Sequence, residues 1–330
     1  HRDVYRTPQL ERLAAEGITF TDAYSSSPVC TPTRTSVMTG RSPQQNQISY
    51  WILHKDRDTG GPREGTPPPN WNVNGLQPDD VTLPRLLQKG GYRTIHAGKA
   101  HLGAKGTAGE DPRNLGFDIN IAGHGAGGPA DYRGQRNFAK DPDNPGKSLW
   151  DIPGLEKYHG QEIYLTEALA LESVAAIRDA HRDKKPFFLH FSPYAVHAPI
   201  IANQRWLDHY GELPAKEAAY ATMIETVDRA LGTLREALED LEILDNTIII
   251  YSSDNGSYRQ ERNGELRGKK GALFEGGHRV PTLLSWPGKI APAKSDALTH
   301  STDLFATIAS MAGVNTNVST VAMPSPKTTA

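Results

Sequence analysis

The stretch "TIIIYSSDNG", residues 247–256, joins a short apolar run to a polar turn. A run of β-branched and aromatic residues without polar alternation is typical of a strand buried on both faces. A long helical pattern precedes it, with one apolar face formed by Met223, Val227, Leu231, Leu234 and Leu238. A helix followed by a buried strand and a polar turn is the repeating unit of an α/β fold.

Two other segments repeat this order. "PFFLHFS", residues 186–192, follows a helical pattern over about 164–181, and "YRTIHAG", residues 92–98, follows the helix predicted in "VTLPRLLQKGG", residues 81–91. Buried strands that alternate with helices pair in parallel, and helices then cover both faces of the sheet. We therefore predict one large, mostly parallel sheet with helices on both faces.

Composition excludes several classes of protein. The chain has 330 residues, 37% of them hydrophobic and 22% charged, with a net charge of −2. These values are typical of a globular protein and give no electrostatic reason to expect nucleic-acid binding. No apolar run approaches the roughly 20 residues of a membrane-spanning helix. A single cysteine cannot form an internal disulfide.

Polar side chains follow each of the three predicted strands. Lys99 and His101 follow the first, His197 the second, and Asp254 and Asn255 the third. In open α/β sheets, ligands bind beyond the carboxyl ends of the strands, so these side chains are predicted to share one site. Each has a simpler explanation: Asp-Asn-Gly is most often a plain turn, and a lone lysine or histidine is most often a surface or packing residue.

The only cysteine lies in "SPVCTPTRTSVMTGR", residues 27–41, at the start of a probable helix. A lone cysteine is usually a buried structural thiol. It can also be a nucleophile activated by a histidine. A helix start favours an anion near Cys30, because backbone N–H groups point outward there.

Five segments together carry a family resemblance. Cys30-Thr-Pro-Thr-Arg34 resembles the Cys-x-Pro-x-Arg signature that directs oxidation of the cysteine to formylglycine. "GYRTIHAGKAHLG", residues 91–103, resembles the second signature of the same family, and "GKKGALFEGGHR", residues 268–279, a third block. "YAVHAP" and "SSDNG" also occur here in the order of that family. Over about residues 5–313 the chain therefore resembles the formylglycine-dependent, arylsulfatase-like sulfatases of the alkaline phosphatase superfamily.

The resemblance implies a nucleophile and its proton partners. Cys30, as formylglycine, would attack sulfur through one hydroxyl of its hydrate, and the second hydroxyl would later expel sulfate. Arg34 would orient this group, and His101 would assist the second deprotonation. His197 would donate a proton to the leaving alcohol oxygen.

The resemblance also implies the charged groups. Lys99 and Lys270 would contact the sulfate, with Lys270 rather than Lys269 in the family's register. Asp254 and Asn255, together with the group formed from Cys30, would bind Ca²⁺, a hard cation that prefers oxygen ligands. The expected partners are a sulfated small molecule or glycan and a formylglycine-generating maturation enzyme.

The expected reaction is hydrolysis of a sulfate ester. A carbohydrate substrate is favoured by long loops that contain Trp51, Trp71, Trp150 and His124, although these side chains could equally serve loop packing. A phosphodiester or phosphonate hydrolase of the same superfamily remains an alternative. So does an inactive remnant that binds a sulfated glycan.

Both ends of the chain depart from the family pattern. The family's Asp-Asp metal ligands close a strand that would precede residue 1, and the family's small C-terminal subdomain has no counterpart here. We expect an N-terminally incomplete catalytic domain over residues 1–313 and a flexible polar tail over 314–330. Activity without the aspartate pair stays open. Family habit predicts a periplasmic or secreted protein, although this chain contains no signal segment.

Overall fold

The computed structural model describes residues 4–60 and 71–315. The predicted tail therefore lies almost entirely outside the described residues. The helices are α1 (Pro8–Glu16), α2 (Cys30–Thr39), α3 (Pro43–Asn46), α4 (Leu83–Lys89), α5 (Leu165–Arg182), α6 (Ala215–Asp240), α7 (Glu275–His278) and α8 (Asp303–Met311). The strands are β1 (Ile18–Phe20), β2 (Ala23–Tyr24), β3 (Arg93–Gly98), β4 (Ile119–Ile121), β5 (Phe187–Ser192), β6 (Ile249–Tyr251), β7 (Thr282–Ser285), β8 (Ala293–Ser295) and β9 (Thr299–His300).

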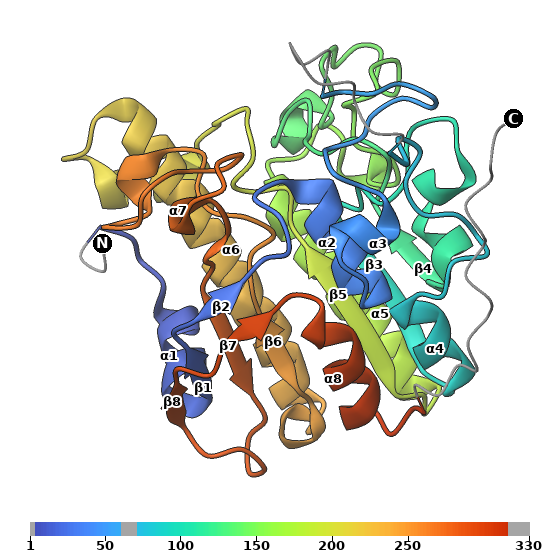
Figure 1. The fold of residues 1–330 in the computed structure, drawn as a ribbon. Coiled ribbons are helices and arrows are strands. Elements are labelled where there is room, and N and C mark those ends of the chain that lie inside the picture. Colours follow the sequence, from blue (N-terminus) through green and yellow to red (C-terminus); the bar gives the residue numbers. More distant parts are fainter. Residues whose placement is uncertain (1–3, 61–70, 316–330) are drawn as a thin grey trace, which may run out of the picture.

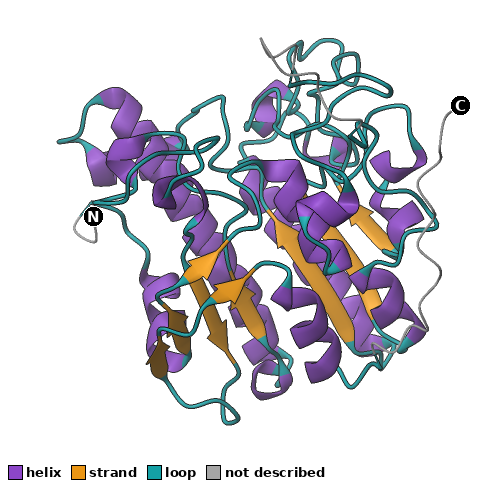
Figure 2. Ribbon diagram, viewed as in Figure 1, coloured by secondary structure: helices purple, strands orange, loops and turns teal. Residues whose placement is uncertain are grey.

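The strands form three sheets rather than the single large sheet predicted. Strands β4, β3 and β5 make a parallel sheet in that order, and β6, β7, β1 and β8 make a second sheet. In the second sheet β7 runs antiparallel to both β6 and β1, whereas the small β2–β9 pair is parallel. The α/β class is confirmed, and most pairings are parallel as expected (Figure 2).

Helices cover both faces of the β4–β3–β5 sheet (Figure 1). Alternate residues of a strand point to opposite faces. Accordingly, Phe187, Leu189 and Phe191 of β5 pack with the apolar residues of α5 and α6. Phe188, between them, packs with residues of α4 and α8. The apolar run of β5 is thus explained by a helical layer on each side.

The segment around residues 247–251, predicted as a strand buried on both faces, is only partly buried. The three residues of β6 are all intermediate in exposure, as are the first five of β5. Within residues 4–60 and 71–315, β6 pairs only with β7, and β5 only with β3. Each strand is therefore the outer strand of its sheet, which leaves one backbone edge without a partner strand.

The long loops gather beyond the carboxyl end of β5, together with the first turn of α2 (Figure 1). This is the edge at which the sequence predicts a site. In the described part of the chain, no helix is long and apolar enough to cross a membrane.

Candidate active site

Cys30 lies at the first position of α2, where the preceding Val29 is extended. The side chain is buried and points at groups from two distant segments. Lys270 Nζ donates to Cys30 Sγ at 3.1 Å, and the thiol lies 3.4 Å from Asn255 Oδ1. Residues 225 and 240 positions away in the sequence thus converge on this sulfur. Its surroundings are far more polar than those of an ordinary structural cysteine.

Arg34, one turn further along α2, connects the ends of three strands. Its Nε donates to Asp254 Oδ2 at 2.7 Å, beyond β6. Its Nη1 donates to the Lys99 carbonyl, beyond β3, and to Ser192 Oγ at 2.6 Å, at the end of β5. Sequence reasoning missed Ser192. Its place at the end of an apolar strand was the available signal.

Three cations surround Asp254. Besides the bond from Arg34, Lys99 Nζ lies 3.6 Å from Asp254 Oδ2, and the charge of Lys270 also acts on it. Burial alone would raise the pKa of this carboxyl, but the cations outweigh burial and hold the pKa well below its usual range. Burial also lowers the pKa of Lys99, an effect that the negative groups near it oppose. Asp254 is therefore a permanent anion in a cationic site.

His101 is brought to the site by a turn rather than by strand alternation. Strand β3 ends at Gly98, and His101 has a positive φ of 54°. Its Nε2 lies 2.7 Å from the Ile52 carbonyl and 3.2 Å from Thr31 Oγ1. Because a carbonyl can only accept, Nε2 carries the proton and Nδ1 is an acceptor. Among the described residues, Nδ1 is buried without a partner.

His101 is neutral in this environment. Burial, followed by the charge of Lys99, lowers its pKa well below the usual value. The ring contacts Thr31, the residue after Cys30, and no hydrogen bond joins it to Cys30 itself within residues 4–60 and 71–315. Thr31 and the Ile52 carbonyl, neither of them predicted, hold its orientation.

His197 follows β5 in a loop and is less enclosed. Its Nδ1 lies 2.9 Å from the Ala198 carbonyl, so Nδ1 carries the proton and Nε2 keeps its lone pair. Tyr132 Oη donates to the His197 carbonyl at 2.7 Å and fixes the backbone. Burial, then the charges of Lys99 and Lys270, lowers the pKa of His197 to about 4.

Two glycines lie against the two histidine rings. A Cβ added at Gly127 would come within 2.6 Å of His101 Nδ1. A Cβ at Gly128 would come within 2.5 Å of His197 Nδ1. Real Cβ contacts are never this short, so any larger residue would displace the ring. The sequence analysis placed His124 of this segment, "GHGAGGPADY", in a long loop and gave its glycines no role, although the glycine content was the signal.

The predicted calcium ligands fit in kind but supply only part of a site. Asn255 Nδ2 donates to the Gly256 carbonyl, which leaves Oδ1 facing Cys30 near the Asp254 carboxylate. These oxygen donors suit a hard cation, but calcium takes six to eight oxygen ligands. The described part of the chain holds no group of three or more His, Cys, Asp or Glu residues that could bind a metal.

Comparison with known proteins shows which family the whole chain resembles. The family model described as Sulfatase matches residues 1–314. Human N-acetylgalactosamine-6-sulfatase is 31% identical over 323 residues, covering 93% of this chain and 58% of that protein. Human arylsulfatase A is 32% identical over 331 residues, covering 93% of this chain and 59% of the relative. The chain thus spans somewhat more than half the length of these relatives.

Solved structures show the same similarity. The crystal structure of Ps i-CgsB superposes with a TM-score of 0.77 at 29% identity and covers 94% of this chain and 67% of that one. The same protein in complex with k-i-k-neocarrahexaose gives a TM-score of 0.76. PsFucS1 sulfatase from Pseudoalteromonas sp. gives 0.69 at 27% identity, with coverages of 94% and 62%.

Proposed function

Since the chain belongs to the sulfatase family, we propose that it hydrolyses a sulfate ester carried by a sugar. The observation that carries this proposal is the convergence of Lys270 and Asn255 on Cys30, at the start of a helix. Chemistry at a sulfate needs a nucleophile among fixed positive charges, and this is such an arrangement.

We propose that Cys30 is matured to formylglycine, which supplies an aldehyde. One hydroxyl of the aldehyde hydrate would be the nucleophile. The other would supply the electron pair that later releases sulfate. The sulfur in this structure stands in for the oxygens of that hydrate. Lys270 Nζ, 3.1 Å away, is within hydrogen-bond reach of such an oxygen. Arg34 orients the first turn of α2 through its bonds to Asp254 and Ser192.

The lysines hold the charge of the reacting sulfate. Lys99 and Lys270 are fixed in the site before substrate arrives, so their ammonium groups need little reorganisation when charge develops on the sulfuryl oxygens. The negative charge of Asp254 attracts both lysines and Arg34, which offsets the repulsion among these three cations. Removing any member would change the field that the others provide.

The two histidines take opposite proton roles. His101 has its free lone pair on Nδ1, so it is suited to accept a proton from the hydrate. His197 is the donor to the leaving oxygen, although without substrate it is neutral at pH 7. A bound sulfate ester brings a negative charge, which favours the protonated ring and raises its pKa.

We propose calcium as the metal, held by Asp254, Asn255 and the group formed from Cys30. It would supply further positive charge for the sulfate. The three donors described here require additional ligands, because calcium takes six to eight oxygens.

A sulfated carbohydrate is supported by the relatives. One is an N-acetylgalactosamine-6-sulfatase, and one solved neighbour contains k-i-k-neocarrahexaose. We further propose one catalytic domain over residues 1–313, and periplasmic or secreted location remains a prediction.

Mass spectrometry of the peptide that carries Cys30, from protein made in its native host, tests maturation. We expect the peptide to carry formylglycine. We also expect the protein to hydrolyse 4-nitrophenyl sulfate, with the activity abolished by Cys30→Ala and reduced by the calcium chelator EGTA. Turnover retained by Cys30→Ala would overturn the mechanism. Faster turnover of bis(4-nitrophenyl) phosphate would favour the phosphodiesterase alternative, and unmodified Cys30 without turnover would favour a binding remnant.

A further inference from the structure

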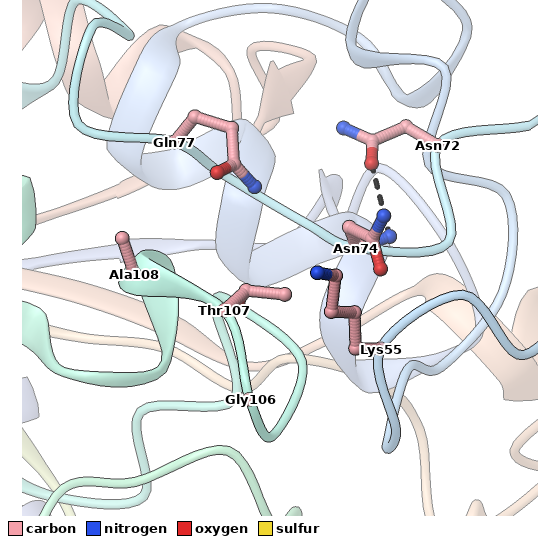
Figure 3. A pocket seen from close by; sticks show the side chains of 7 residues that line it. All are labelled: Lys55, Asn72, Asn74, Gln77, Gly106, Thr107 and Ala108. Atoms are coloured by element: carbon pink, nitrogen blue, oxygen red, sulfur yellow. Dashed lines mark hydrogen bonds between the residues drawn. The ribbon is translucent and has the colours of Figure 1, made fainter.

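A polar cavity of about 370 Å³ lies outside the proposed catalytic site. It is lined by Lys55, Asn72, Asn74, Gln77, Gly106, Thr107 and Ala108, which come from three separate segments (Figure 3). Of the described residues that line it, none has an aromatic side chain or a branched aliphatic one. A ligand would therefore have to be recognised by hydrogen bonds rather than by apolar burial.

The cavity is built on the same backbone that holds His101. The Ile52 carbonyl binds the His101 ring, and Lys55 lies only three residues further along the chain. Three residues span at most about 11 Å, so the cavity is close to the catalytic groups. Backbone bonds from Lys105 to Leu53 and from Lys55 to Lys105 tie the segments together. A substrate longer than one sugar could reach from one site to the other.

Some lining groups hold the wall, whereas others are free to bind. Asn74 and Asp56 exchange two hydrogen bonds, at 2.8 and 2.9 Å, and Asn72 Oδ1 accepts from the Asn74 backbone. In contrast, within residues 4–60 and 71–315, neither Lys55 Nζ nor Gln77 Oε1 has a hydrogen-bond partner. Thr107 Oγ1 donates to the Ala104 carbonyl and can still accept. The cavity thus offers ammonium donors beside amide and hydroxyl acceptors.

The charge around the cavity decides what kind of ligand fits. Three carboxylates bond to its walls: Asp56 to Asn74, Glu110 to the Gly106 N–H and Asp80 to the Gln77 N–H. Among the described residues Lys55 is the only cation in the lining, and these carboxylates outnumber it, so a second sulfate or a carboxylate would be repelled. A neutral polyol would not be repelled, and its hydroxyl groups can pair with the ammonium, amide and hydroxyl groups of the lining.

From these observations we propose that this cavity is a subsite for an uncharged sugar unit of the glycan whose sulfate ester is cleaved. The proposal rests on the proposed function and adds that the substrate is an oligosaccharide rather than a sulfated monosaccharide. Lys55 donates to the hydroxyl groups of this unit, and Gln77 accepts from them.

The test is the double variant Lys55→Ala/Gln77→Ala, assayed on a neocarrahexaose and on 4-nitrophenyl sulfate. We expect KM for the hexasaccharide to rise about 5- to 20-fold, as for two lost hydrogen bonds, and KM for the aryl sulfate to change less than about twofold. Since the contact is to an uncharged sugar unit, the ratio of the variant's KM to the wild-type KM for the hexasaccharide should be the same at low and high salt. Lys89→Ala, at the exposed end of α4, is the matched control.

Equal KM for the hexasaccharide in variant and wild type would overturn the subsite. If this KM ratio fell toward 1 in high salt, the cavity would bind an anionic group, and the proposal of an uncharged sugar unit would be wrong. If wild type hydrolyses neither substrate, the proposed function fails separately. Calorimetric titration of the hexasaccharide into both proteins then decides the subsite, with about 5- to 20-fold weaker binding expected for the variant.

Discussion

Strands β3 and β6 both deliver residues to the candidate site, but the protein covers them differently. β3 lies between β4 and β5, and five of its six residues are buried. β6 has the more apolar sequence, yet all three of its residues are only partly buried. The described part of the chain gives it one neighbour, β7. The apolarity of a strand's sequence thus does not by itself determine how far the strand is buried.

The difference extends to the site residues beyond each strand. On the β3 side, Lys99 and His101 are 3% and 2% exposed and are held by packing and backbone carbonyls. On the β6 side, Asp254 is held mainly by charge, through Arg34 and Lys99. We therefore expect loss of a charge to have its larger effect on the β6 side of the site. A change in side-chain volume should have its larger effect on the β3 side.

The largest effect should come from Asp254→Asn. The change leaves Arg34 and Lys99 without their shared anion, and breaking a largely buried ion pair costs about 3 kcal/mol. We expect this loss in the free energy of unfolding, measured with urea, and a fall of at least about 10³-fold in kcat for 4-nitrophenyl sulfate. Asp245→Asn, in an exposed turn before β6, should change neither. If Asp254→Asn were as stable as the wild type, the ion pairs of Asp254 would not stabilise the β6 side of the site.

His197→Ala should separate substrates by their leaving group. Loss of a general acid costs about 10²- to 10⁴-fold for a poor leaving alcohol, but little for nitrophenol, which leaves without a proton. The measurement is kcat for an alkyl or sugar sulfate against 4-nitrophenyl sulfate. Equal losses on both substrates would remove His197 from the donor role.

A smaller effect is expected from Gly127→Ala and Gly128→Ala, which add volume against His101 and His197. Displacing a catalytic group by about 1 Å can cost roughly 10²-fold, so we expect kcat to fall about 10- to 100-fold with little change in KM. Gly211→Ala is the control, because its added Cβ meets nothing closer than 3.9 Å. If Gly128→Ala resembles His197→Ala in its leaving-group dependence, the glycine acts through that ring.

The smallest effect concerns His96, a buried histidine of the β4–β3–β5 sheet. His96 Nδ1 lies 3.1 Å from His190 Nδ1 across β3 and β5, and burial lowers the pKa of His96 to about 4. Between pH 6.5 and pH 4 the unfolded chain binds a proton that the folded chain excludes, so stability falls as pH falls. For His96 the loss between pH 7 and pH 5 is about 2 kcal/mol.

Urea unfolding at these two pH values measures this loss. His96→Gln should reduce the difference by about 2 kcal/mol, whereas His181→Gln, at the exposed end of α5, should leave it unchanged. A pH dependence that His96→Gln does not alter would mean that this histidine is already accessible to protons in the folded protein.

Local patterns predicted much of the secondary structure. The helices over residues 83–89 and 165–182 agree closely with prediction, because apolar periodicity and Gly or Pro stops are properties of neighbouring residues. The start of α2 at Cys30 was predicted for the same reason. The strand segments were also found, but their division into three sheets depends on pairing partners, and their burial on tertiary packing, neither of which a local pattern specifies.

The sequence by itself determined the chemical inventory of this protein. The residues from Cys30 to Arg34, with Lys99, Lys270 and Asp254, are recognisable because they stand in the order and local spacing of the family's signatures. Only the tertiary structure decided how they are held. The Ile52 carbonyl that fixes His101 is 49 residues away from it, and Ser192 lies 158 residues from Arg34. Contacts at such separations arise from packing whole segments together, which leaves no trace in local spacing.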